Sequence, residues 1–346
     1  MSRLFVLGCG AVSPAGWGRE ALAGAVAAEV PLATRELARP GWPVGLTIRP
    51  VPTPPAPLKH LANPRVRRTS PIAHYTVTAA LEALGQDLDA VLARSKRLGI
   101  VYCTMSGCVN YSRRFYDEAL RDPATASPLI FPETVFNSPA SHLAAILGTP
   151  FLNYTLVGDP GVFLNGVALA AQWLGAGRID SCLVVGAEEH DWLTADAFRL
   201  FSPQVVLGAG AGALYLSADP GAEPLAEVIG ITDPRSFESS RSRFEAAALV
   251  RREFPRPEDH CLLVDGLQDA SVFDRTEAAA WSDWEGDRCS PKKILGEGLM
   301  AGAAWQCVLA AEALKQSIRH RAAYVSIVGC NQQAIGAQFV PAKAVL

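Results

Sequence analysis

The stretch from residue 153 to residue 189, NYTLVGDPGVFLNGVALAAQWLGAGRIDSCLVVGAEE, constrains the fold more than any other part of the chain. Asn153 to Val157 is a β-rich run. Asp159 suits a helix N-cap, and Pro160 suits the first helical position, where no N–H is needed. Apolar residues then recur near helical spacing as far as Leu174, and a second apolar strand follows at 183–185. The stretch therefore predicts a strand, a tight turn, a helix and a second strand.

A strand–turn–helix elbow often presents a nucleophile at the helix N-terminus, where the helix dipole stabilises an anion. This elbow offers Asp159, Pro160 and Gly161. None of the three is a serine or a cysteine. The elbow therefore has the shape that such chemistry uses but lacks the reacting atom.

The rest of the chain alternates between strand-like and helix-like segments, which predicts an α/β fold. We expect strands at 4–7, 97–103 and 226–233, and helices at 17–28, 69–84, 111–120 and 241–252. The glycines after residue 7 predict a turn. Residues 39–64 are rich in proline and predict a surface connection without a regular element.

Composition narrows the possible functions. A hydrophobic content of 49% and a charged content of 19% describe a globular chain with a large core, and a net charge of −3 argues against nucleic-acid binding. The eight cysteines show no CxxC pair, so we expect reduced thiols in a cytoplasmic protein and no metal site. No apolar helix is long enough to span a membrane, and no motif predicts a cofactor.

Three motifs resemble those of the β-ketoacyl synthases, which have the thiolase fold. NYTLVGDP resembles the segment that carries the catalytic cysteine, GRIDSCLVVGAEE the strand that follows it, and GAGAGALYLS (208–217) a later strand. The resemblance implies two similar halves stacked in α-β-α-β-α layers. It places the seam at 217/218, with a ketosynthase-like N-terminal half at 1–217 and a shortened C-terminal half at 218–346.

The positions that carry catalysis in this family hold other residues here. Pro160 stands where the family has its cysteine. Asp265 or Gly266, and Glu297, stand where it has two histidines, and Lys292 falls on the family's lysine. An acidic side chain repels a developing enolate instead of stabilising it. The resemblance therefore implies that no residue of this chain catalyses condensation.

Within this family, catalytically empty members are chain length factors, which pair with an active ketosynthase in type II polyketide synthases and receive acyl carrier protein. The resemblance implies a heterodimer and a shared acyl tunnel. Its expected interface residues are Asn137, Ser138, His142, Asn153, Tyr154 and Asp159. Pro160 differs from the glutamine usual in chain length factors, which favours a partner of a polyene-forming or other highly reducing synthase.

The helix at 111–120 is expected to line this tunnel. Its candidates for setting acyl length are Tyr111, Phe115, Tyr116 and Leu120, and the alternative is that these are ordinary core residues. Two other functions remain open. One is a homodimeric enzyme that acts on acyl thioesters with Asp159, Lys292 and Glu297, and the other is a scaffold that binds acyl carrier protein.

Overall fold

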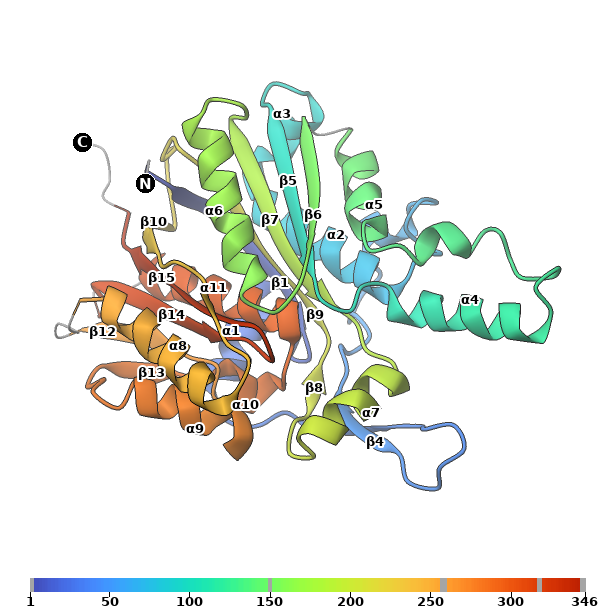
Figure 1. The fold of residues 1–346 in the computed structure, drawn as a ribbon. Helices are drawn as coiled ribbons and strands as arrows, with labels where there is room; N and C mark the ends of the chain where they lie inside the picture. Colours follow the sequence, from blue (N-terminus) through green and yellow to red (C-terminus); the bar gives the residue numbers. More distant parts are fainter. Residues whose placement is uncertain (1–2, 149–150, 256–259, 316–318, 343–346) are drawn as a thin grey trace.

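The computed structural model describes residues 3–148, 151–255, 260–315 and 319–342 (Figure 1). The strands are β1 (Phe5–Ser13), β2 (Gly16–Trp17), β3 (Arg35–Leu37), β4 (Leu46–Arg49), β5 (Leu98–Thr104), β6 (Leu152–Val157), β7 (Ser181–Glu188), β8 (Leu207–Gly208), β9 (Gly210–Ser217), β10 (Ala226–Ile231), β11 (Arg235–Ser236), β12 (Cys261–Val264), β13 (Asp287–Cys289), β14 (Ala322–Val328) and β15 (Gln333–Val340). The helices are α1 (Arg19–Ala27), α2 (Pro71–Leu84), α3 (Leu88–Leu92), α4 (Val109–Arg121), α5 (Ser138–Leu147), α6 (Val162–Gly175), α7 (Trp192–Phe201), α8 (Ser240–Glu253), α9 (Ser271–Ala280), α10 (Pro291–Leu295) and α11 (Leu299–Lys315). Short 3₁₀ turns include η3 (Phe131–Glu133).

The main sheet consists of two halves with the same strand order. The order is β6-β5-β7-β9-β1 in the first half and β13-β12-β14-β15-β10 in the second. When the five strands of each half are numbered in chain order, the strand order of both halves is 3-2-4-5-1. The halves join through a short antiparallel pairing of β1 with β10, in which Phe5 lies opposite Glu227. The predicted seam at 217/218 falls between β9 and β10, and this shared order supports it; the division into domains stays a prediction.

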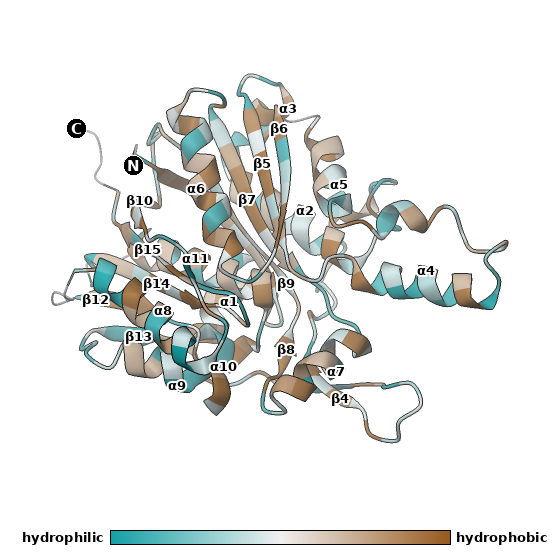
Figure 2. Cartoon of the chain, in the orientation of Figure 1, coloured by the Kyte–Doolittle hydropathy of each residue, from teal (hydrophilic) through white to brown (hydrophobic). Residues whose placement is uncertain are grey.

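Three separate hydrophobic clusters show the layers. The largest lies between the two halves of the sheet and surrounds α6 and α11. The second lies under α2 and α5 on the outer face of the first half, and the third lies under α8 on the outer face of the second half. The predicted α/β fold with α-β-α-β-α layers is confirmed, and Figure 2 shows the hydrophobic residues gathered on the inner strands and helices.

Helix α11 is the central element of the molecule. Its sequence, LMAGAAWQCVLAAEALK, is apolar except for Gln306, Glu312 and Lys315, as expected for a helix buried between two sheets. The indole Nε1 of Trp305 donates to the carbonyl oxygens of Val12 (3.1 Å) and Ala211 (3.0 Å), on neighbouring strands of the first half. A Cβ on Gly212 would lie 2.7 Å from Ala304, so glycine permits this close packing.

Two expectations about local structure are wrong. The glycines after residue 7 do not form a turn, because β1 continues to Ser13. A Cβ on Gly8 or Gly10 would lie 2.1 Å from a carbonyl oxygen of α2, so both glycines are needed for helix packing. The 39–64 connection is also not free of regular structure, since it contains β4, which pairs with β3 and β8. Over the described residues, no helix has the length and apolar character needed to cross a membrane.

Candidate functional site

Pro160 lies buried at the start of α6, directly after Asp159. The Asp159 side chain does not cap α6, as the sequence had suggested. Its carboxylate instead accepts four backbone N–H groups from the turn between β14 and β15, at 2.8–3.3 Å; the donors are Cys330, Asn331, Gln332 and Gln333. Burial raises the pKa of Asp159, and these four donors limit that rise because they stabilise the charged form. Asp159 is thus fully engaged in holding the turn.

Lys292 and Glu297 form a buried ion pair. The ammonium Nζ lies 2.8 Å from Oε2 of Glu297, and both side chains are almost completely buried. The other carboxylate oxygen, Oε1, accepts the N–H of Leu299 (2.8 Å) at the start of α11. Burial alone would lower the pKa of Lys292, but the adjacent carboxylate raises it above its ordinary value, so the lysine stays charged. The two charges neutralise each other inside the protein.

Asp265 and Gly266 follow β12 and belong to a second buried carboxylate network. Asp265 accepts the hydroxyl of Ser290 at 2.7 Å and lies 3.4 Å from Arg288, while the Gly266 N–H donates to Glu277 at 3.1 Å. Glu277 also accepts the hydroxyl of Ser326 at 2.6 Å. Burial, together with the charge of Asp265, raises the pKa of Glu277 to about 7. Each of these carboxylates is satisfied by groups of the chain itself.

The structure brings Asp159, Lys292 and Glu297 together around Cys330. The charges of Asp159, Lys292, Glu297 and Arg243 all reach its thiol, and burial raises the pKa of that thiol well above its ordinary value. Cys330 is therefore a neutral thiol and not an activated nucleophile. Sequence reasoning had identified all but two of the residues in this cluster. It missed Arg243 and did not assign Cys330 to the site, because neither lies in a recognisable motif.

Arg243 holds the same turn as Asp159, from the opposite side. Its guanidinium donates to the carbonyl oxygens of Val328, Gly329 and Cys330, and it lies about 5 Å from the ring centres of Phe237 and Phe273. Asp159 binds the N–H groups of the turn and Arg243 binds its carbonyl groups. The turn is consequently fixed by two buried charges.

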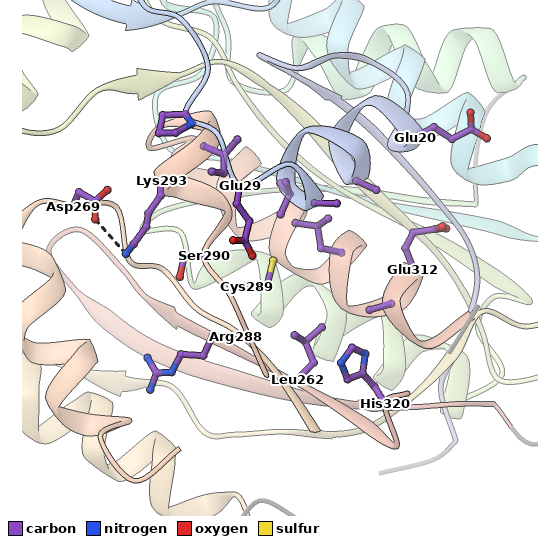
Figure 3. Close-up of a pocket in the computed structure, with 17 residues that line it drawn as sticks. Glu20, Glu29, Leu262, Asp269, Arg288, Cys289, Ser290, Lys293, Glu312 and His320 are labelled. Atoms are coloured by element: carbon purple, nitrogen blue, oxygen red, sulfur yellow. Dashed lines mark ion pairs between the residues drawn. The ribbon is translucent and has the colours of Figure 1, made fainter. Parts of the chain in front are cut away.

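An apolar pocket of about 420 Å³ leads from the surface to Cys330. Its walls come from α7, from the starts of α8 and α9, and from Met105 after β5. They include Phe198, Phe201, Phe237 and Phe273. A larger cavity of about 760 Å³ lies elsewhere, between α1, α10 and α11 (Figure 3), and its Lys293 is paired with Asp269 at 3.2 Å. None of Pro160, Asp265, Gly266, Lys292 and Glu297 lines that larger cavity.

The expected tunnel helix is α4, which projects from the body of the molecule (Figure 1). None of its residues is buried, so the alternative that Tyr111, Phe115, Tyr116 and Leu120 are core residues is wrong. Phe115 packs on Phe131 of η3, with ring centres 5.3 Å apart. Tyr116 and Leu120 are 62% and 67% exposed, and the Tyr111 hydroxyl donates to the carbonyl oxygen of Arg68.

The expected interface residues lie on α5, at the start of α6 and on β6, an edge strand that pairs only with β5 in the described chain. Asn137, Asn153 and Tyr154 are exposed, whereas Ser138 and Asp159 are buried. His142 is half-buried and pairs with Glu133 at 2.8 Å. The edge of β6 thus presents open backbone groups beside exposed side chains.

Two sheet halves of equal strand order enclose two central helices, and both helices begin at one buried polar cluster. These features define the thiolase-like fold of the ketosynthases.

Comparisons with known proteins agree with this class. No family model matches the sequence, and no curated protein matches it. Solved structures match over 99% of the chain. The ishigamide ketosynthase/chain length factor is 20% identical, with 100% of that chain covered and a TM-score of 0.79. The AntDE:AntF complex of a type II polyketide synthase acyl carrier protein with its ketosynthase is 15% identical, with 99% covered and a TM-score of 0.80. The ketosynthase ApeO in complex with its chain length factor ApeC, from Xenorhabdus doucetiae, is 13% identical, with 98% covered and a TM-score of 0.79. At these identities the likeness establishes the ketosynthase fold.

Proposed function

We propose that this chain is a non-catalytic chain length factor that pairs with an active ketosynthase in a type II polyketide synthase. The observation that carries the proposal is the buried Lys292–Glu297 pair at one of the degenerate catalytic positions. A condensing site needs groups that are free to donate to a developing oxyanion or to move a proton. Here each charged group is committed to a partner within the chain.

The open edge of β6 and the projecting α4 support a partner subunit. Exposed apolar side chains gather on both and on the segment after α4; they include Tyr116, Leu120, Leu129, Phe131 and Tyr154. Apolar side chains on an unpaired strand edge mark a surface that another chain covers. Two of the similar structures, the ishigamide protein and ApeO with ApeC, combine a ketosynthase with a chain length factor.

Acyl carrier protein is the second partner that we propose. One similar structure is a ketosynthase complex with its acyl carrier protein, bound to a hexaketide. Polyene or other highly reducing biosynthesis is the product class that we favour, because Pro160 departs from the usual glutamine. The described residues form no disulfide, which fits a reducing compartment such as the cytoplasm.

The test is co-expression with a candidate ketosynthase, followed by measurement of the mass of the purified complex. We expect a one-to-one complex whose condensing activity is lost when the partner's cysteine is replaced. Pro160→Cys in this chain should not restore that activity, because Glu297 and Asp265 remain. A chain that purifies as a homodimer and processes acyl thioesters alone would overturn the proposal.

The role of α4 predicts a change in product length. Phe115→Ala removes one ring of the Phe115–Phe131 pair and should give longer products, because the space that ends the acyl tunnel becomes larger. Phe131→Ala should act in the same direction, whereas Arg114→Gln on the same helix should leave product length unchanged. Mass spectrometry of the products of the reconstituted complex measures this, and unchanged products in both phenylalanine variants would contradict it.

A further inference from the structure

Helix α4 needs an anchor, since it buries none of its own residues against the body. Past its first turns, the contacts that hold it are ion pairs within the helix and contacts with the segment that follows it, such as Phe115 with Phe131. What fixes its direction must therefore lie at its base. Four consecutive residues at the end of β7, Glu188 to Asp191, contact this base.

Glu188 holds the segment that leads into α4. Its side chain is completely buried, and its carboxylate accepts the N–H groups of Met105 and Ser106, the latter at 3.1 Å. It also lies 3.4 Å from the hydroxyl of Thr104, and that hydroxyl accepts the N–H of Gly107 at 3.1 Å. Three successive backbone amides before the helix are thus bound directly or through one hydroxyl.

Glu189 joins the beginnings of two helices. One carboxylate oxygen accepts the N–H of Asn110 in the first turn of α4, and the other accepts the N–H of Ile72 in the first turn of α2, both at 3.0 Å. The Ser70 hydroxyl donates to the same carboxylate. Neither helix has a side-chain cap from its own N-cap residue. A single buried carboxylate therefore satisfies both helix N-termini, where negative charge is favoured.

The next two residues continue the same line of contacts. The carbonyl oxygen of His190 accepts the Asn110 side-chain amide at 3.4 Å. Asp191 is 4% exposed and forms an ion pair with Arg113 at 2.9 Å, one turn further along α4. The four residues together contact α4 and its base from Met105 to Arg113.

We infer that residues 188–191 form a latch that sets the direction of α4, and that this latch holds α4 in the position in which it meets the partner subunit. The statement about the partner subunit rests on the proposed function. The statement that residues 188–191 set the direction of α4 concerns this chain alone. Glu188 and Glu189 are positioning residues, because they act through α4 and touch no substrate.

Hydrogen exchange of the isolated chain tests the latch. In Glu189→Gln the charged acceptor is lost, so exchange at the amides of 105–113 should become about tenfold faster or more. Tryptic cleavage at Arg113, Arg114 and Arg121 should increase in parallel, while α6 and α11 keep their protection. Arg113→Gln removes the ion pair with Asp191 from its more exposed partner, and it should loosen residues 105–113 without disturbing the core. The matched control is Glu245→Gln, the same change at an exposed ion pair of α8.

Unchanged exchange at 105–113 in both variants would overturn the inference, and so would an equal loss of protection throughout the chain. The partner-binding half is measured separately, as the affinity of each variant for the ketosynthase. If α4 is loosened but the affinity for the ketosynthase is unchanged, the latch does not hold α4 for partner binding, and that part of the inference is overturned. A wild-type chain that does not bind a ketosynthase would instead overturn the proposed function and leave the exchange result standing.

Discussion

The Lys292–Glu297 pair shows how two opposite charges can be held inside this fold. Both side chains lie in the interior, where an isolated charge is strongly disfavoured. Each is stable there because the other is present, and because Glu297 also accepts the N–H of Leu299. Removing one partner should therefore cost more free energy than the pair contributes to folding stability, because the remaining charge is left buried and unpaired.

Lys292→Met should lower the unfolding free energy by about 3–5 kcal/mol, because it leaves Glu297 as an unpaired buried charge. The double variant Lys292→Met/Glu297→Gln should recover most of that loss, since glutamine is neutral and still accepts the Leu299 N–H. Urea unfolding of the single and double variants measures the coupling. Arg241→Met, at the exposed pair with Glu245, should change stability very little, and a double variant as unstable as the single would contradict this account.

Glu188 makes stability depend on pH. Burial raises its pKa from an ordinary value of 4.5 to about 8, and its neighbours Tyr102 and Cys108 also have raised pKa values and stay neutral. Between these two pH values the folded chain binds one proton more than the unfolded chain. The unfolding free energy should therefore fall as the pH rises from 4.5 to 8. Unfolding curves of Glu188→Gln should lack this part of the slope, those of Glu245→Gln should keep it, and equal slopes in all three proteins would contradict the assignment.

At the scale of single elements, local periodicity predicted helices α1, α2, α4, α6 and α8 but not the central helix α11. Helix α2 begins at Pro71, two residues after the predicted start, and α4 extends the expected 111–120 by a residue or two at each end. The errors came from residues whose role is set by distant parts of the chain. Gly8 and Gly10 make room for α2, and Asp159 binds a turn that lies about 170 residues later. No local pattern carries that information.

The sequence also predicted part of the candidate site. Motif resemblance located Pro160, Asp265, Gly266, Lys292 and Glu297, and the charges of Lys292 and Glu297 reach one thiol, that of Cys330. Motifs could not show how their charges are paired, because pairing depends on three-dimensional distance. The acidic run from Glu188 to Asp191 is visible in the sequence, but its contacts with α4 are not.

The edge strand β6 predicts a specific sensitivity of partner binding. Val157 is 51% exposed at the end of β6, and Val157→Lys should weaken the complex with the ketosynthase about tenfold or more, because a charge would be buried there. Val272 on α9 is 55% exposed, so Val272→Lys is a matched control that should leave affinity unchanged. Titration of both variants against the partner measures the difference. Equal affinities of the two variants for the ketosynthase would show that the end of β6 does not contact the partner.

At the scale of the whole molecule, the two halves share a core. Helix α11 belongs to the second half, but it packs on β7 and β9 of the first half, and Trp305 donates to carbonyl oxygens of Val12 and Ala211. Residues 1–217 expressed alone would expose the face that α11 covers.

We therefore expect residues 1–217 to aggregate when expressed alone and to become soluble when co-expressed with residues 218–346. Size-exclusion chromatography and circular dichroism of the separate and combined pieces measure this. An N-terminal piece that folds cooperatively alone, with native protection of β7 and β9, would show that the shared core is not required.

The two ends of the main sheet differ in a way that limits how many copies can assemble. At one end, β6 is six residues long, and its outer edge is unpaired in the described chain. At the other end, β13 has only three residues, and its Asp287 is tied to Arg319 and His320. A strand edge that is short and charged resists pairing with another chain. We therefore expect β6 to take up one partner strand, and the short, charged edge of β13 in the described chain not to take up another. Assembly through the main sheet should then end at a pair instead of growing into a filament.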